Sequence, residues 1–199
     1  MKLPVNWFDF ALVLMLLVGL LRGRKRGMSE EFLTCTKWVV LIVLCALAYE
    51  PLGTFAAGMT PFSKLFCYIV CYLAVAGLVA GGFALIKNSI GGKLIGSDTF
   101  GGSEYYLGMP AGMLRFACIT MLFLALLNAR QYRTSEVMAM KKFQNDNYGS
   151  EFFPTLQSVQ SQVFEKSLMG PPIKEYLSFF LIKPTLPENK EIARAKEKY

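Results

Sequence analysis

Five charged residues of this 199-residue sequence lie inside long apolar runs or close to their ends, where a charge could have a specific task. Asp9 and Arg115 fall inside such runs, while Arg26, Glu31 and Glu104 lie next to them. A charge in a bilayer is costly unless it is paired, hydrated or able to reach the interface, so it is a functional candidate by default. We take all five as candidate functional or partner-contact residues.

The sequence favours few other kinds of chemistry. It has no histidine, which removes Ser-His and Cys-His nucleophile pairs and imidazole metal sites. The five cysteines fall in apolar runs without a CxxC pair, as small buried hydrophobes do. Glu31, Asp98 and Glu104 could in principle hold a metal, but they lack the tight carboxylate spacing of such sites. We expect no catalytic residue, cofactor or metal ion.

Two arrangements would satisfy the charge of Arg115. Its long side chain could reach back to the headgroups, or it could pair with Glu104. Their separation of eleven positions corresponds to roughly 16 Å along a continuous helix, so a direct pair needs the Glu104 segment to fold back. Asp9 and Arg115 begin near opposite faces of the membrane, so we do not expect them to meet.

The elements that must position these charges are membrane helices. Apolar residues make up 54% of the chain, charged residues 18%, and the mean hydropathy is +0.40. We expect an all-α integral membrane fold with four transmembrane helices and a C-terminal amphipathic helical tail. The spans are predicted at residues 3–21, 32–49, 62–86 and 107–129, and Pro51 and Gly53 are expected to end the second.

Three segments carry glycines four residues apart, which lie on one face of a helix and let another backbone approach closely. This spacing favours a tightly packed bundle. The helix-packing glycines are Gly19 and Gly23, Gly77 and Gly81, and Gly108 and Gly112.

The basic residues indicate membrane orientation rather than nucleic-acid binding. The net charge is +7, but the cations gather in short loops and in the tail. The cluster "RGRKRG" follows the first apolar run, whereas a signal peptide carries its positive charge before that run. The positive-inside rule places loops 22–31 and 87–106 in the cytoplasm and both termini outside. The expected partners are the lipid bilayer, a homo-oligomer or other envelope proteins.

The chain divides into a membrane domain, residues 1–130, an amphipathic helical extension, residues 131–183, and a charged flexible end, residues 184–199. Pro154 suits the first turn of a helix that Gly170-Pro171-Pro172 is expected to stop. The apolar stretch "IKEYLSFFLI" is too short to span, so we expect it to lie in the interface or pack on another surface.

Three short stretches have residue types in a distinctive order. They contain Trp7, Asp9 and Ala11, then Arg26, Gly27, Glu31 and Trp38, and finally Gly102, Glu104, Leu107, Gly108, Gly112 and Arg115. In the order and spacing of these residues the sequence resembles the colicin V production protein (CvpA) family, small bacterial inner-membrane proteins with four predicted spans. The resemblance covers about residues 6–130 and not the tail after Tyr132. Three residue types differ from the family's pattern: Glu104 replaces an Asp, Tyr105 an Arg and Phe116 a Gly.

The resemblance implies a role in production or export of a peptide toxin, colicin V, and in envelope homeostasis. We expect a non-enzymatic membrane protein that works through partners. The first alternative is an oligomeric small channel or transporter subunit, with Asp9 and Arg115 lining a polar path. A membrane enzyme is the least favoured alternative.

Overall fold

The computed structural model describes residues 5–95, 101–148 and 155–186. Of the expectations above, those on Asp98, Pro154 and residues 187–199 lie outside the described residues. The described part is helical throughout, apart from connecting segments and one isolated bridge between Arg130 and Thr185. Its elements are α1 (Trp7–Met59), α2 (Lys64–Ile95), η1 (Gly101–Ser103), α3 (Glu104–Asn128), α4 (Thr134–Tyr148), α5 (Leu156–Phe164), α6 (Gly170–Tyr176) and η2 (Ser178–Phe180).

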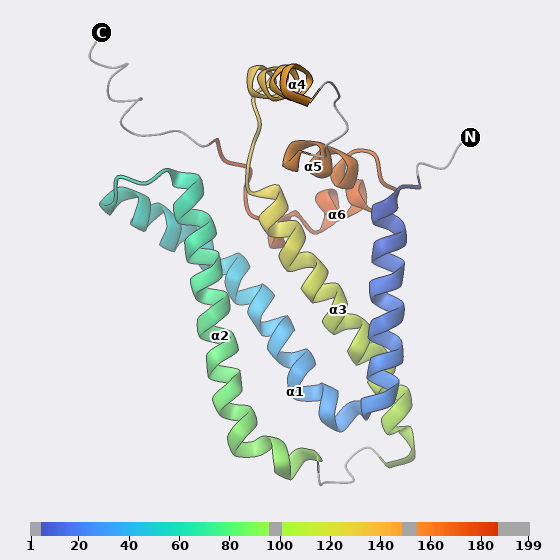
Figure 1. The fold of residues 1–199 in the computed structure, drawn as a ribbon. Coiled ribbons are helices and arrows are strands. Elements are labelled where there is room, and N and C mark those ends of the chain that lie inside the picture. The colour runs from blue at the N-terminus through green and yellow to red at the C-terminus, as the bar shows by residue number, and fades with distance from the viewer. Residues whose placement is uncertain (1–4, 96–100, 149–154, 187–199) are drawn as a thin grey trace.

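The first helix is bent in the middle into two arms. Its 53 residues would extend about 80 Å if straight, far more than a bilayer core of about 30 Å. Gly27 breaks the helical conformation with φ 77° and ψ 170°, a region open essentially to glycine alone. The two arms of α1 therefore lead away from a shared bend, and Figure 1 shows them running in opposite directions with their far ends apart.

Three helices of the described part are long and apolar enough to cross a membrane: α1, residues Lys64–Ser89 of α2, and Gly101–Asn128, which contains α3. Four separate spans are not shown. The reason is that residues 22–31, expected to form a loop, are helical on both sides of Gly27 and join the first two predicted segments into α1.

Helix α1 begins at a capping box and ends later than predicted. Asn6 and Asp9 form a capping box that starts the helix at Trp7. The predicted stop at Pro51 and Gly53 is wrong, because the helix continues to Met59. Pro51 removes the one backbone hydrogen bond that its N–H would make to the Leu47 carbonyl, and membrane helices tolerate such a proline.

The core lies between the second arm of α1, the first half of α2 and the end of α3. Tyr49, Tyr68 and Tyr72 meet there edge to face, with ring centroids 5.6 Å and 6.2 Å from Tyr49. A side chain at Gly53 would collide with the ring of Tyr68, so glycine permits this crossing of α1 and α2. The second half of α2 lies apart from the other helices, as Figure 1 shows. Apolar side chains of α2 such as Leu78 are exposed.

The tail folds over the end of the bundle where α1 begins and α3 ends (Figure 1). The expected amphipathic helix is shorter than predicted, since α5 ends at Phe164. Gly170-Pro171-Pro172 does not stop it but opens α6, because proline fits the first turn of a helix. The apolar stretch that follows packs inward, and Leu181 and Ile182 join the core with 2% and 0% of their surface exposed.

Candidate functional site

The first arm of α1 and the start of α3 cross along a seam of glycines. A Cβ atom added at Gly19 would lie 2.8 Å from the carbonyl oxygen of Gly112, and one added at Gly23 would collide with the carbonyl of Gly108. The two helices are therefore antiparallel at this crossing: Gly19 faces Gly112, and Gly23 faces Gly108. Backbones can approach this closely only where both helices present glycine.

The seam continues to the bend of α1. A Cβ atom at Gly27 would lie 2.7 Å from Cγ of Glu104, so the Glu104 side chain lies directly against the bend. Gly77 and Gly81, the third pair of packing glycines, are placed differently. An added Cβ atom at either position meets no atom within 4 Å, so the described part of the chain brings no other helix to that face of α2.

A buried ion pair joins the second arm of α1 to α3. Nη1 of Arg115 lies 2.6 Å from Oε1 and 2.5 Å from Oε2 of Glu31. Glu31 is 0% exposed and Arg115 5% exposed, so neither charge reaches water or headgroups. The Arg115 guanidinium also lies 4.9 Å from the centre of the Phe116 ring, a favourable cation–π distance.

Neither arrangement expected for Arg115 is found. It does not reach the interface, and it pairs with Glu31 instead of Glu104. The reason is the bend at Gly27, which turns the second arm back so that Glu31 lies opposite Arg115. Arg26 adds a second cation, with Nη1 3.5 Å from Glu31 and Nε 3.3 Å from Glu30.

Asp9 binds backbone N–H groups and no cation among the described residues. Its Oδ2 accepts hydrogen bonds from Asn6 N–H at 2.8 Å and Leu168 N–H at 3.0 Å, and its Oδ1 accepts one from Met169 N–H at 3.0 Å. The residue is 6% exposed. Asp9 therefore fastens the tail to the first turn of α1, far from the Glu31–Arg115 pair.

Replacing Asp9 with asparagine should loosen the tail. The amide keeps one acceptor oxygen but loses the charge and the second acceptor, so at least one of three charge-assisted hydrogen bonds is lost, at a cost of about 1.5–3 kcal/mol. We expect faster amide hydrogen exchange in residues 156–185 of the full chain, with little change in α2.

Glu50→Gln is the matched control for this change. It also removes one carboxylate that holds the tail, but that carboxylate bonds Nζ of Lys183 at 2.7 Å in an exposed pair. Exposed pairs contribute little, so exchange in the tail should stay close to that of the unmodified chain. Equal exchange in the Asp9→Asn and Glu50→Gln variants would contradict the docking role of Asp9.

Further polar contacts fix the tail to the end of the bundle. The Asn128 amide donates to the Ile182 carbonyl at 3.0 Å, and Thr185 N–H donates to the Ala129 carbonyl at 2.8 Å. The Tyr49 hydroxyl accepts a hydrogen bond from Lys183 N–H at 3.2 Å. The hydrogen bond to Glu50 raises the pKa of the Lys183 ammonium. The tail is thus part of the folded bundle.

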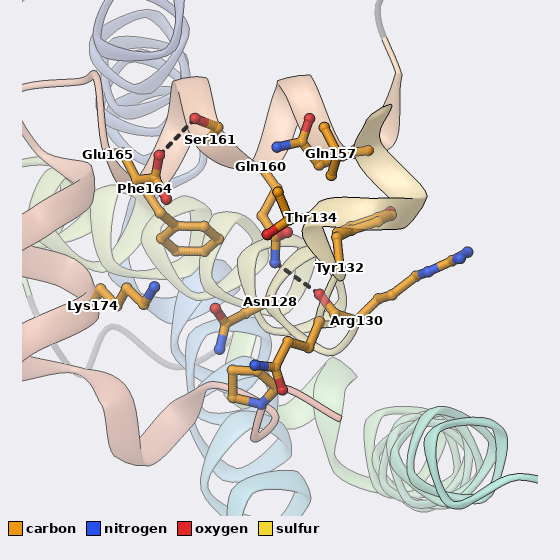
Figure 2. Close-up of a pocket in the computed structure, with 13 residues that line it drawn as sticks. Asn128, Arg130, Tyr132, Thr134, Gln157, Gln160, Ser161, Phe164, Glu165 and Lys174 are labelled. Atoms are coloured by element: carbon orange, nitrogen blue, oxygen red, sulfur yellow. Dashed lines mark hydrogen bonds between the residues drawn. The ribbon is translucent and has the colours of Figure 1, made fainter. Parts of the chain in front are cut away.

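A polar pocket of about 450 Å³ lies between the end of α3 and the tail, as Figure 2 shows. The Gln160 amide crosses it and donates to the carbonyls of Leu127 and Arg130 at 3.1 Å. The Arg130 guanidinium lies 4.7 Å from the centre of the Tyr132 ring, and burial raises the pKa of the Tyr132 hydroxyl. Its lining combines amides, hydroxyls and aromatic rings with two cations and the Glu165 carboxylate.

The described residues contain no group of three or more His, Cys, Asp or Glu side chains that could hold a metal ion. Of the five charged candidates, the structure brings Arg26, Glu31 and Arg115 together, places Glu104 beside the bend, and places Asp9 at the opposite end.

Two parts of the site were not recognised from the sequence. One is the role of Gly27 as the bend, although its place four residues after Gly23 continues the glycine spacing. The other is the group of tail anchors, which includes Asn128, Gln160 and Tyr49. Nothing in the local sequence distinguishes these from other polar residues of helices.

Comparison with known proteins adds a family relationship. The sequence model of the family described as Colicin V production protein matches residues 8–164. The match therefore extends beyond Tyr132, through α4 and α5, whereas the resemblance seen in the sequence covers only residues up to about 130. No curated protein and no solved structure matches the chain.

Proposed function

Because the chain belongs to the colicin V production protein family, we propose that it is a non-enzymatic, multi-pass protein of the bacterial inner membrane. It acts through partner proteins in the production or export of a peptide toxin and in envelope homeostasis. The observation that carries this proposal is that the charges inside the bundle are already engaged in holding the fold. Glu31 binds Arg115, and Asp9 binds the backbone of the tail.

The partner surface in this proposal is the outer side of the tail. Tyr176 and Phe179 are 78% and 56% exposed there, with Met169 nearby in the sequence and also exposed. Aromatic residues, Met and Arg are enriched in protein interfaces, and Lys174 of α6 also lines the polar pocket. Because Asp9 and Asn128 fasten the tail to the bundle, a partner bound there would be held at a set position over the helices.

In the proposed membrane arrangement the two arms of α1, α2 and α3 make four crossings. The bend of α1 and the start of α3 lie at one end of the bundle, and the start of α1 and the tail lie at the other (Figure 1). The cations at the bend, among them Arg22, Arg24 and Lys25, favour the cytoplasm for that end. Both termini and the proposed partner surface then face outward.

Site-specific cross-linking in intact cells tests the partner role. A photo-reactive amino acid is placed at Tyr176 or Phe179 on the tail, with Leu78 on α2, 77% exposed, as the control position. We expect discrete cross-linked products with another envelope protein or a second copy from the tail positions only. Native membrane discs should contain particles heavier than one chain. A solitary chain whose tail cross-links only to lipid would contradict the proposal.

The alternative is an oligomeric channel or transporter subunit. It is favoured by the Glu31–Arg115 pair, since ionisable groups inside membrane helices often mark a transport path. Ion or solute flux in liposomes that contain only the purified chain distinguishes the two functions. The partner role predicts no flux above that of empty liposomes, and the alternative predicts flux that changes in the Arg115→Gln variant.

A further inference from the structure

The bend of α1 presents a group of cations that the fold does not use. Arg22, Arg24 and Lys25 are exposed and, within the part of the chain that the structure describes, have no carboxylate partner. Arg26 differs, since it contacts Glu30 and Glu31. Three cations held on about one turn of helix repel one another, so this arrangement favours binding of an anion.

Two surface clefts open beside these cations. One, of about 580 Å³, is lined by Val18, Leu21, Arg22, Lys25, Arg26 and Glu30. The other, of about 420 Å³, is lined by Leu21, Arg24, Lys25, Tyr105, Tyr106 and Met109. Leu21 and Lys25 line both clefts, which therefore lie on either side of the same edge of α1. The one carboxylate among these lining residues, Glu30, is engaged by Arg26 at 3.3 Å.

Each cleft combines an apolar part with a charged part. Val18 and Leu21 belong to the apolar first arm of α1 and are 41% and 64% exposed, while the cations follow them toward the bend. Tyr105 and Tyr106, 58% and 71% exposed, begin α3 at the same end of the bundle. Exposed aromatic rings beside cations at the end of membrane helices are typical of the headgroup level of a bilayer.

We propose that these two clefts bind the headgroup phosphate of an anionic glycerophospholipid, with its acyl chains along Leu21. In one cleft Arg22 and Lys25 would donate to the phosphate oxygens, and in the other Arg24 and Lys25 would do so; a guanidinium group can donate with two parallel N–H groups. The apolar part of each cleft distinguishes this ligand from free inorganic phosphate, which would gain nothing from Val18 or Met109. This inference concerns the opposite end of the bundle from the proposed partner surface and does not depend on it.

Lipid retention tests the proposal with the full chain. The protein is placed in membrane discs of phosphatidylcholine and phosphatidylglycerol in equal amounts, released into mild detergent, and its bound lipids are counted by native mass spectrometry. The variant is Arg22→Gln with Lys25→Gln, two exposed positions whose change should leave the fold intact. The control is Lys141→Gln with Lys142→Gln on α4, which removes the same charge far from the bend.

We expect the unmodified chain and the Lys141/Lys142 control to retain phosphatidylglycerol preferentially. The Arg22/Lys25 variant should lose this preference by about thirtyfold, the effect of removing two cations near a membrane surface. Equal losses in the two double variants would show diffuse charge attraction and overturn the proposal, as would an unmodified chain with no preference. Displacement of the lipid by millimolar inorganic phosphate would also overturn it, because the site would then recognise phosphate without the lipid.

Discussion

Replacing Arg115 with glutamine should lower the free energy of unfolding of the bundle by about 3–5 kcal/mol. Glu31 is 0% exposed, and its two carboxylate oxygens lie 2.6 Å and 2.5 Å from Nη1 of Arg115. Without the guanidinium, the one ion pair left to this carboxylate among the described residues is the longer contact with Arg26 at 3.5 Å. A buried charge that has lost its partner costs free energy.

Equilibrium unfolding in mixed detergent micelles measures this loss. Glu31→Gln should destabilise by a comparable amount, because it leaves the Arg115 cation buried without its partner. The combination of Glu31→Leu and Arg115→Met should be much closer to the unmodified chain than either single change, since an apolar pair needs no charge compensation.

Arg24→Gln is the control for the loss of one cation, because Arg24 is exposed and lines only a surface cleft. Its free energy of unfolding should be within about 0.5 kcal/mol of the unmodified value. An Arg115→Gln variant as stable as Arg24→Gln would show that the buried pair does not hold the two helices together.

The second large effect is expected along the glycine seam. Gly112→Ala places a Cβ atom against the carbonyl oxygen of Gly19 and 2.8 Å from Cα of Gly23. Gly108→Ala places one against the carbonyl of Gly23. Backbone atoms cannot turn aside as a flexible side chain can, so the helices must separate, at a cost of about 1–3 kcal/mol for each change. Leucine at either position should prevent the crossing altogether.

The chain contains matched controls for these substitutions. Gly77→Ala and Gly81→Ala add the same methyl group to membrane helix α2, where no atom lies within 4 Å. They should leave stability unchanged or raise it by up to about 1 kcal/mol, because alanine favours the helix more than glycine does. The same unfolding measurement applies. Equal stabilities of the Gly112→Ala and Gly77→Ala variants would contradict the close crossing of α1 and α3.

The seam also illustrates how far local sequence can predict packing. The four-residue spacing correctly marks one face of a helix, but the same spacing at Gly77 and Gly81 faces no helix in the described part of the chain. Glycines four residues apart show that a helix face allows close contact, and they do not show that another helix packs there. Which face receives a neighbour depends on where the next helix lies, and α3 lies against Gly19 and Gly23 of α1.

The errors in helix limits have a similar origin. Pro51 and the run "RGRKRGMSE" read locally as interruptions, yet helix α1 continues through both, with only Gly27 outside the helical conformation. Backbone groups inside a membrane must be hydrogen-bonded within the protein, so a helix tends to continue wherever its neighbours can satisfy it. Local propensity does not include that constraint.

By itself the sequence determined the class of protein and the position of its charges. The apolar runs require a helical membrane protein, because only helices and closed barrels satisfy the backbone in lipid, and Asp9 and Arg115 were recognisable as charges within those runs. Their partners were decided only by the tertiary structure. Glu31 is 84 residues from Arg115, and Leu168 is 159 residues from Asp9. Such contacts depend on a bend at one glycine and on a tail folding back over the bundle, and no local pattern encodes either.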